Sequence, residues 1–188
     1  FFLAAMASTP AASAEPIPVR VVTFNAWGLK LLSTRRAERL AEAGRRLAAL
    51  KPDIAALQEV WVAADRRVVS EELRRAGLPH QRYFRSGLFG SGLLLASRFP
   101  IAAARFERFV IAGKPHKPWH GDFYGGKGFT LFELSTPAGR LRLVNTHLQA
   151  SYASPEYALH KLAQALQLAS ALDDRSLPLV FAGVLNLG

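Results

Sequence analysis

Apolar runs and alternating apolar and polar positions predict a series of strands interrupted by three helices. Short stretches rich in β-branched and apolar residues, bounded by Gly, Pro or Asp, are typical of strands. By this criterion we expect strands over residues 19–25, 54–57, 81–85, 93–97, 101–110, 129–134, 141–146 and 178–182. The sequence Thr136-Pro137-Ala138-Gly139 separates two of these strands and predicts a hairpin.

Apolar residues recur with helical spacing in three segments, residues 33–50, 65–76 and 155–172. Ser33 or Thr34 is the expected N-cap of the first helix, and Asp65 that of the second, because their side-chain oxygens can accept unpaired backbone N–H groups. One face of the third helix is predicted to point inward, and it consists of Leu159, Leu162, Leu166 and Ala169. Strands interleaved with helices favour an α/β fold in which helices cover sheets.

Composition sets broad limits on the class of protein. A length of 188 residues favours one domain, and a hydrophobic content of 50% is enough for a sizeable core. The absence of cysteine excludes disulfides and thiolate-bound metals. The formal net charge of +10 favours anionic partners, either nucleic acid or anionic lipid, without choosing between them.

The first residues are typical of the end of a secretory signal peptide. An apolar stretch covers residues 1–7, and the small residues Ala12, Ser13 and Ala14 precede Glu15 in the manner of a cleavage site. We therefore assign residues 1–14 to a signal-peptide remnant and residues 15–188 to a partial domain, and we expect a secreted or periplasmic protein. No initiator Met precedes the stretch, so we expect the sequence to begin inside the leader. No apolar run reaches the ~20 residues that a membrane span needs.

Polar residues at the ends of predicted strands are the first candidates for a functional site. Asn25 ends the first strand, and Glu59 follows the apolar run 54–57, where packing does not explain a carboxylate. Neighbouring strand ends can place both residues at one edge of a sheet, and Mg²⁺ prefers oxygen ligands of this kind. Taken alone, Glu59 also fits a surface carboxylate, and His147, at the end of a later strand, also fits a structural histidine.

A glycine-rich loop over residues 120–128 contains Asp122 and Lys127. Glycines let the backbone approach a ligand closely, and Lys127 supplies a point charge for a phosphate, which Asp122 can position. An ordinary hairpin loop with solvated charges explains the same sequence, so the segment alone leaves both interpretations open.

Four motifs occur in order along the chain. They are Thr23-Phe24-Asn25-Ala26-Trp27-Gly28, the segment 53–61, Gly90-Ser91-Gly92-Leu93 and Val144-Asn145-Thr146-His147-Leu148. Together they resemble the endonuclease/exonuclease/phosphatase superfamily of Mg²⁺-dependent phosphodiesterases. The resemblance implies an α/β fold with a two-sheet β-sandwich flanked by helices, the DNase I-like four-layer fold, incomplete at its C-terminus. Segments 25–29, 59–61, 84–87, 120–128 and 157–160 are similar to neutral sphingomyelinases, which implies hydrolysis of sphingomyelin to ceramide and phosphocholine.

The resemblance also implies roles for individual residues. Glu59 and Asn25 would bind the metal, Mg²⁺ or Mn²⁺. The implied catalytic residues are His147, Asn186 and Asn145, the last as a supporting hydrogen-bond residue. The implied contacts to the substrate phosphate are Lys127, Asp122, His147 and Asn186. We expect a monomer that binds a phospholipid headgroup at a membrane surface, with nucleic acid as the alternative substrate.

The chain departs from this family at Phe181-Ala182-Gly183-Val184-Leu185-Asn186, where the resemblance leads to the expectation Gly-Asp-Leu-Asn. Valine cannot accept a hydrogen bond, and the family's later Asp-His segment, which supplies a general base, has no counterpart in this sequence. We therefore predict that the chain by itself is inactive and poorly stable. Two alternatives remain open, namely a nuclease of the same superfamily and a non-catalytic lipid- or phosphate-binding module, which Val184 favours.

Overall fold

The computed structural model describes residues 17–29, 34–112, 125–151, 155–174 and 176–186. One mixed sheet, the β1–β4 sheet, has the strand order β1 (Val21–Asn25), β2 (Ile54–Gln58), β4 (Leu94–Ser97) and β3 (His80–Tyr83). The other, the β5–β8 sheet, has the order β5 (Ile101–Arg108), β6 (Gly128–Thr136), β7 (Gly139–His147) and β8 (Leu179–Val184). Three helices accompany them, α1 (Arg36–Ala49), α2 (Ala63–Arg75) and α3 (Glu156–Ala171).

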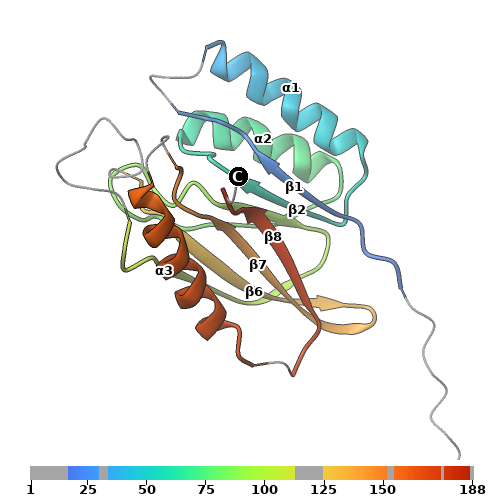
Figure 1. Ribbon diagram of the computed structural model, residues 1–188. Coiled ribbons are helices and arrows are strands. Elements are labelled where there is room, and N and C mark those ends of the chain that lie inside the picture. Colours follow the sequence, from blue (N-terminus) through green and yellow to red (C-terminus); the bar gives the residue numbers. More distant parts are fainter. Residues whose placement is uncertain (1–16, 30–33, 113–124, 152–154, 175, 187–188) are drawn as a thin grey trace, which may run out of the picture.

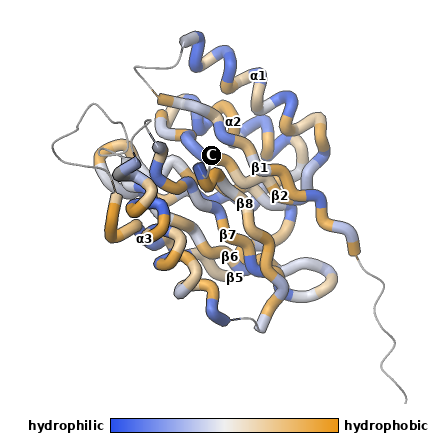
Figure 2. Tube along the Cα trace, viewed as in Figure 1, coloured by the Kyte–Doolittle hydropathy of each residue, from blue (hydrophilic) through white to orange (hydrophobic). Residues whose placement is uncertain are grey.

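These elements form four layers, with α1 and α2 on one outer face, the two sheets in the middle and α3 on the other outer face (Figure 1). Strand β2 shows why, because its side chains are buried on both faces. Ala55 and Leu57 pack in the core beneath α1 and α2, whereas Ile54 and Ala56 pack between the sheets. Figure 2 shows hydrophilic and hydrophobic residues alternating along α1, as expected for a helix with one face against a sheet. The predicted two-sheet sandwich is confirmed.

The β5–β8 sheet separates its side chains in the same way. Phe132 and Leu143 point into the core between the sheets, while Phe129 and Val144 pack in a third core beneath Leu168 of α3. The predicted hairpin is confirmed as β6 and β7, which pair antiparallel. No helix in the described ranges is long and apolar enough to cross a bilayer.

Strand direction places several strand ends at the same edge of the molecule. Strand β1 runs parallel to β2, so that Asn25 lies opposite Gln58, and β7 runs parallel to β8, so that His147 lies opposite Val184. The antiparallel strands β4 and β6 begin at this same edge. The fold therefore collects the ends of strands from both sheets at one edge, which is called below the polar edge.

The predicted helix caps are wrong. Asp65 is the third residue of α2, whose N-cap is Val62, and its side chain is buried in an ion pair with Arg36 of α1. The α1 N-cap position is occupied by Arg35, which makes no side-chain capping bond. Thr34 therefore does not cap α1, and Ser33 lies outside the described residues. The acidic residue at the start of α2 does not act as a local cap, because its side chain joins the two helices.

The predicted inward face of α3 is also wrong. Side chains of Leu159, Leu162 and Leu166 are 73%, 56% and 61% exposed, and Ala169 is exposed as well. The buried positions are Tyr157, Gln164 and Leu168. The physical reason is that α3 covers loop backbone as well as sheet, and loop backbone requires hydrogen bonds. Polar residues therefore occupy much of the inner face of α3. The spacing of apolar residues, used alone, predicts the outer face instead.

Candidate active site

Polar side chains from three strand ends meet at the polar edge. Asn25 ends β1, Glu59 directly follows β2, and His147 ends β7. The Asn25 amide donates from Nδ2 to Glu59 Oε1 at 2.9 Å, and His147 Nδ1 lies 3.9 Å from the same oxygen. The structure thus brings together three of the predicted site residues from both sheets. All three are at least partly buried, so their geometry is set by the fold.

The backbone at this edge adopts a conformation that is uncommon for residues with a side chain. Three of the five non-glycine residues with positive φ in the described ranges lie here: Trp27 at 45°, Glu59 at 58° and Asn186 at 51°. Such residues cost on the order of 1–3 kcal/mol each and persist where their surroundings determine them. Gly28 donates its N–H to the Glu59 carbonyl at 3.1 Å, and a Cβ at Gly28 would lie 2.4 Å from that oxygen. Glycine at position 28 therefore permits the close approach of this loop to the backbone of Glu59.

Asn25 is oriented by two hydrogen bonds. Its Oδ1 accepts the Trp27 N–H at 2.9 Å, while its Nδ2 donates to Glu59. Arg39 of α1 donates to the carbonyls of Ala26 and Trp27, both at 2.9 Å, and thereby fixes the same loop. In this geometry Asn25 positions the Glu59 carboxylate, and its role as a metal ligand stays a prediction.

A second group of predicted residues converges on the Leu148 carbonyl. Lys127 Nζ and Asn186 Nδ2 both donate to this oxygen at 2.9 Å. Lys127 is 2% exposed, so it lies beneath the surface of the edge. The Asn186 carbonyl accepts from Lys161 Nζ at 2.6 Å. Since Leu148 follows His147, the structure places Lys127 and Asn186 close to the first group.

Lys161 was missed by the sequence reasoning. It lies on the inner face of α3 and also donates to Ser151 Oγ at 2.9 Å. The available signal was a polar stripe on one helix face, in which Lys161 precedes Gln164 by one turn. The predicted phosphate contact Asp122 lies outside the described residues, as does most of the 120–128 loop.

Asn145 lies in the interior, one layer below the site. It is fully buried, and its Nδ2 donates to the carbonyls of Leu57 at 3.1 Å and Leu94 at 3.4 Å. Its Oδ1 accepts from Gln58 Nε2 at 2.8 Å, which joins the two sheets. Gln58 was also missed, although a glutamine at the end of an apolar strand run is the kind of buried polar residue that needs an explanation. Asn145 and Gln58 immediately underlie His147 and Glu59.

His147 is held in its neutral form. Burial, with a smaller contribution from the positive charge of Lys127, lowers the pKa of His147 to about 2. Its Nδ1 is buried without a hydrogen-bond partner among the described residues, and 3.9 Å to Glu59 is too long for a hydrogen bond. The contact between His147 and Glu59 is therefore not an ion pair at neutral pH.

The oxygen atoms at the edge fit a hard divalent cation. Glu59 Oε1 accepts the Asn25 amide, which leaves Oε2 available, and the Glu59 side chain is 12% exposed. Mg²⁺ is commonly bound through one or two carboxylates while it keeps several waters. The described residues contain no group of three or more His, Asp or Glu side chains that could bind a metal. Glu59 with Asn25 is thus a donor set for Mg²⁺ and not a closed protein cage.

Val184 is placed where it can influence the site. It pairs in register with His147, is half-buried, and accepts the Leu148 N–H at 2.9 Å. The preceding Gly183 has φ 147°, and a Cβ there would lie 2.3 Å from the Thr146 carbonyl oxygen. The glycine of the expected Gly-Asp-Leu-Asn sequence therefore lets β8 approach Thr146 closely, while Val184 provides no carboxylate.

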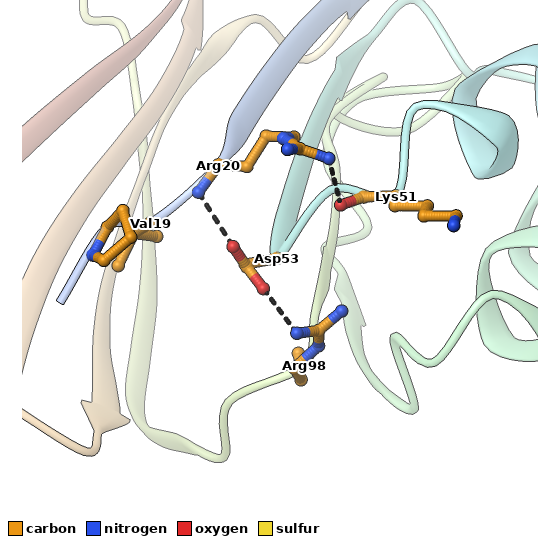
Figure 3. Close-up of a pocket in the computed structure, with 6 residues that line it drawn as sticks. Val19, Arg20, Lys51, Asp53 and Arg98 are labelled. Atoms are coloured by element: carbon orange, nitrogen blue, oxygen red, sulfur yellow. Dashed lines mark hydrogen bonds and ion pairs between the residues drawn. The ribbon is translucent and has the colours of Figure 1, made fainter.

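A pocket of about 480 Å³ lies at the opposite edge of the sheets. Figure 3 shows Asp53 at its centre. The Asp53 carboxylate accepts the Arg20 N–H at 2.8 Å and pairs with Arg98 at 2.8 Å. The Arg20 guanidinium is itself bound to the Leu50 carbonyl at 2.9 Å. These charges stabilise strand starts and the end of α1, so we assign this pocket a structural role.

With the fold and the edge described, the class of protein can be stated. The model of the Endonuclease/Exonuclease/phosphatase family matches residues 22–187, and the chain belongs to this family. It is 39% identical over 164 residues to the inositol phosphosphingolipids phospholipase C of Schizosaccharomyces pombe, covering 85% of this chain and 38% of that protein. It is 36% identical over 160 residues to the sphingomyelin phosphodiesterase 2 of Rattus norvegicus, covering 84% and 38%. The chain thus spans less than two fifths of the length of these curated relatives.

Solved structures support the same fold. Sphingomyelinase C from Streptomyces griseocarneus superposes with a TM-score of 0.73 at 22% identity, covering 90% of this chain and 64% of that chain. A variant of beta toxin from Staphylococcus aureus with bound magnesium ions gives a TM-score of 0.76 at 15% identity, covering 90% and 65%. At these identities the likeness concerns the fold.

The neutral state of His147 predicts how the stability of the chain depends on pH. The native pKa lies near 2 and the ordinary value is 6.5, so the unfolded chain binds a proton that the native chain excludes within that range. Stability is therefore retained above about pH 6.5 and falls as the pH drops below it, by about 2 kcal/mol at pH 5. Urea unfolding at pH 7.5 and pH 5, with a chelator present, should show a smaller loss for His147→Gln. His80→Gln serves as the control for removal of a histidine, and an unchanged pH response in His147→Gln would contradict a buried neutral imidazole.

Proposed function

We propose that this domain belongs to a Mg²⁺-dependent phosphodiesterase that hydrolyses sphingolipid headgroups, with sphingomyelin converted to ceramide and phosphocholine. The observation that carries the proposal is the meeting of Asn25, Glu59 and His147, from both sheets, at one edge. Named relatives at 33–39% identity that act on phosphosphingolipids support the choice of substrate class. Secretion or periplasmic export remains a proposal supported by the apolar leader at residues 1–14.

Each residue at the edge has a role that follows from its contacts. Glu59, oriented by Asn25, would bind the cation, which when bound supplies positive charge to the phosphate oxygens. His147 is neutral, so one ring nitrogen can donate a hydrogen bond to a phosphate oxygen without adding a full charge. Lys127 and Asn186 both donate to the Leu148 carbonyl and so fix the backbone directly after His147. Asn145 supports this arrangement from below.

Val184 supports a second candidate function. An apolar side chain in register with His147 cannot orient a water or accept a proton. A protein that binds a phosphorylated headgroup without hydrolysing it would have no need of a carboxylate there. A nuclease of the same family is the third candidate, because the basic composition suits a phosphate backbone as well.

Metal binding is predicted to depend on Glu59. Addition of Mg²⁺ to the 188-residue chain should raise its melting temperature, and Glu59→Gln should remove that rise because the amide offers no negative charge. Differential scanning fluorimetry with Mg²⁺, Mn²⁺ and chelator measures this directly. Glu38→Gln, on the exposed face of α1, is the matched control and should keep the rise. A Mg²⁺ response that survives Glu59→Gln would place the metal elsewhere.

Catalysis is predicted to increase when a carboxylate is placed at position 184. The assay uses a protein that contains the complete domain. In that protein, Val184→Asp should raise Mg²⁺-dependent release of phosphocholine from sphingomyelin by about 10²-fold, which is the usual effect of one preorganised polar group in an active site. The half-buried position can solvate the charge, so the fold should survive, and the nearby anion should raise the pKa of His147. Phosphocholine release and plasmid nicking are measured side by side.

Three outcomes separate the candidates. Faster release of phosphocholine than nicking of DNA supports the proposed function. Nicking without phosphocholine release would indicate the nuclease. Unchanged low activity in a well-folded Val184→Asp protein would favour the binding module.

A further inference from the structure

Another pocket, of about 330 Å³, lies beside the polar edge and takes no part in the chemistry described above. Its lining includes Trp61, Arg66, Tyr83, Arg85, Leu88 and Phe89, and it is called here the Arg66 pocket. One wall starts two residues after Glu59. Another wall is joined to the loop before Lys127, because the Gly126 N–H donates to the Gly90 carbonyl at 3.1 Å. A ligand in this pocket would therefore sit next to the substrate.

The charges in the Arg66 pocket are not neutralised by the protein. Ten other arginines of the described ranges are ion-paired with carboxylates, namely Arg35, Arg36, Arg45, Arg46, Arg74, Arg75, Arg98, Arg105, Arg140 and Arg142. Within the same ranges neither Arg66 nor Arg85 has a carboxylate within ion-pair distance. Two arginines that line one pocket without a carboxylate partner in the described ranges are complementary to an anion.

Arg66 is also pre-positioned. Its guanidinium carbon lies 3.8 Å from the centroid of the Tyr83 ring, and NH1 donates to the Trp61 carbonyl at 3.4 Å. A guanidinium has five N–H donors in a planar fork, which suits phosphate oxygens, and only one of them is used here. Ser86 also lines the pocket, and its hydroxyl adds a further donor of the kind that phosphate oxygens accept. The pocket therefore offers several hydrogen-bond donors and little to accept a cation.

The rim of the pocket is apolar. Leu88 is 74% exposed and Phe89 is 51% exposed, and only Gly87 separates them from Arg85 and Ser86. Large exposed apolar side chains next to unpaired cations are typical of surfaces that contact the headgroup and upper acyl region of anionic bilayers. A soluble phosphate would gain nothing from Leu88 and Phe89, so the rim favours a lipid as the source of the anion.

We propose that the Arg66 pocket binds the phosphate of an anionic lipid that lies next to the substrate in the membrane. Arg66 and Arg85 contact the phosphate oxygens, and Leu88 and Phe89 enter the adjacent apolar region. This proposal rests on the proposed action at a lipid surface. It would also orient the domain, because the loop that carries Glu59 continues into the pocket wall at Trp61.

Vesicle binding in the presence of a chelator tests the pocket without requiring catalysis. The 188-residue chain should float with phosphatidylcholine vesicles that contain phosphatidic acid and bind pure phosphatidylcholine vesicles far less. Arg66→Gln/Arg85→Gln should weaken binding to the phosphatidic acid vesicles by about thirtyfold, since each cation near an anionic bilayer contributes about fivefold. Arg45→Gln/Arg140→Gln removes the same charge from positions already paired with Glu42 and Glu133, and should have a much smaller effect.

Two further variants guard against misfolding and identify the source of the anion. Arg85→Gln alone leaves the Arg66–Tyr83 stack intact and should weaken binding by about fivefold. Leu88→Ser should weaken vesicle binding several-fold but leave the thermal shift with glycerol 3-phosphate unchanged. Equal losses of vesicle binding in the two double variants would contradict the proposed lipid site. Equal binding to vesicles with and without phosphatidic acid would contradict it as well. Glycerol 3-phosphate binding without vesicle binding would overturn the lipid assignment, and neither result depends on whether phosphocholine is released.

Discussion

The hydrogen bond between Gln58 and Asn145 is the interaction on which the geometry of the polar edge depends. It joins side chains 87 positions apart at 2.8 Å, and it is buried between the two sheets. Glu59 follows Gln58 directly, and His147 lies two residues beyond Asn145. Any slip of one sheet against the other would therefore separate the carboxylate from the imidazole. Apolar packing between the sheets supplies most of the stability, but it tolerates small shifts that a buried amide pair does not.

The same pair of amides also lowers the stability of the core, because one of its polar atoms is left without a hydrogen bond. Gln58 Nε2 also donates to Thr23 Oγ1 and the Ala56 carbonyl, both at 3.1 Å, while Gln58 Oε1 is buried without a partner in the described ranges. A buried unsatisfied acceptor costs about 1–3 kcal/mol. Together with the positive φ of Glu59 and Asn186, this indicates that the edge is less stable than an apolar core would be. Such local costs are common where a fold positions reactive groups.

Much of this structure could be predicted from sequence, because period-2 and helical patterns report burial on one face. The eight strands, three helices and sandwich follow from those patterns together with the family motifs. The predictions of the helix caps and of the inward face of α3 were wrong for one reason. Long-range polar contacts, and not the local sequence pattern, determine which side chains are buried there. Asp65 pairs with Arg36 across two helices, and Gln164 takes an inward position. Contacts of this kind depend on tertiary placement, which a single sequence does not encode locally.

The positions of the candidate site residues were easier to predict from sequence than those of the residues that support them. Asn25, Glu59 and His147 stand at strand ends, where motif and topology coincide. Gln58 and Lys161 act through hydrogen bonds to other parts of the chain, so their roles became visible only with the structure. The consequence of Val184 also depends on the structure. Val184 lies in register with His147, so a valine there leaves the neighbourhood of the imidazole without a carboxylate.

The most direct measurement of the central claim is a double-mutant cycle across the sheet interface. Gln58→Leu and Asn145→Leu each leave buried polar partners unpaired and should cost about 2–3 kcal/mol in urea unfolding. The double variant should lose clearly less than the sum, giving a coupling energy of about 1 kcal/mol or more. Strictly additive losses would show that the two amides do not stabilise each other, and that the sheets are aligned by apolar packing alone.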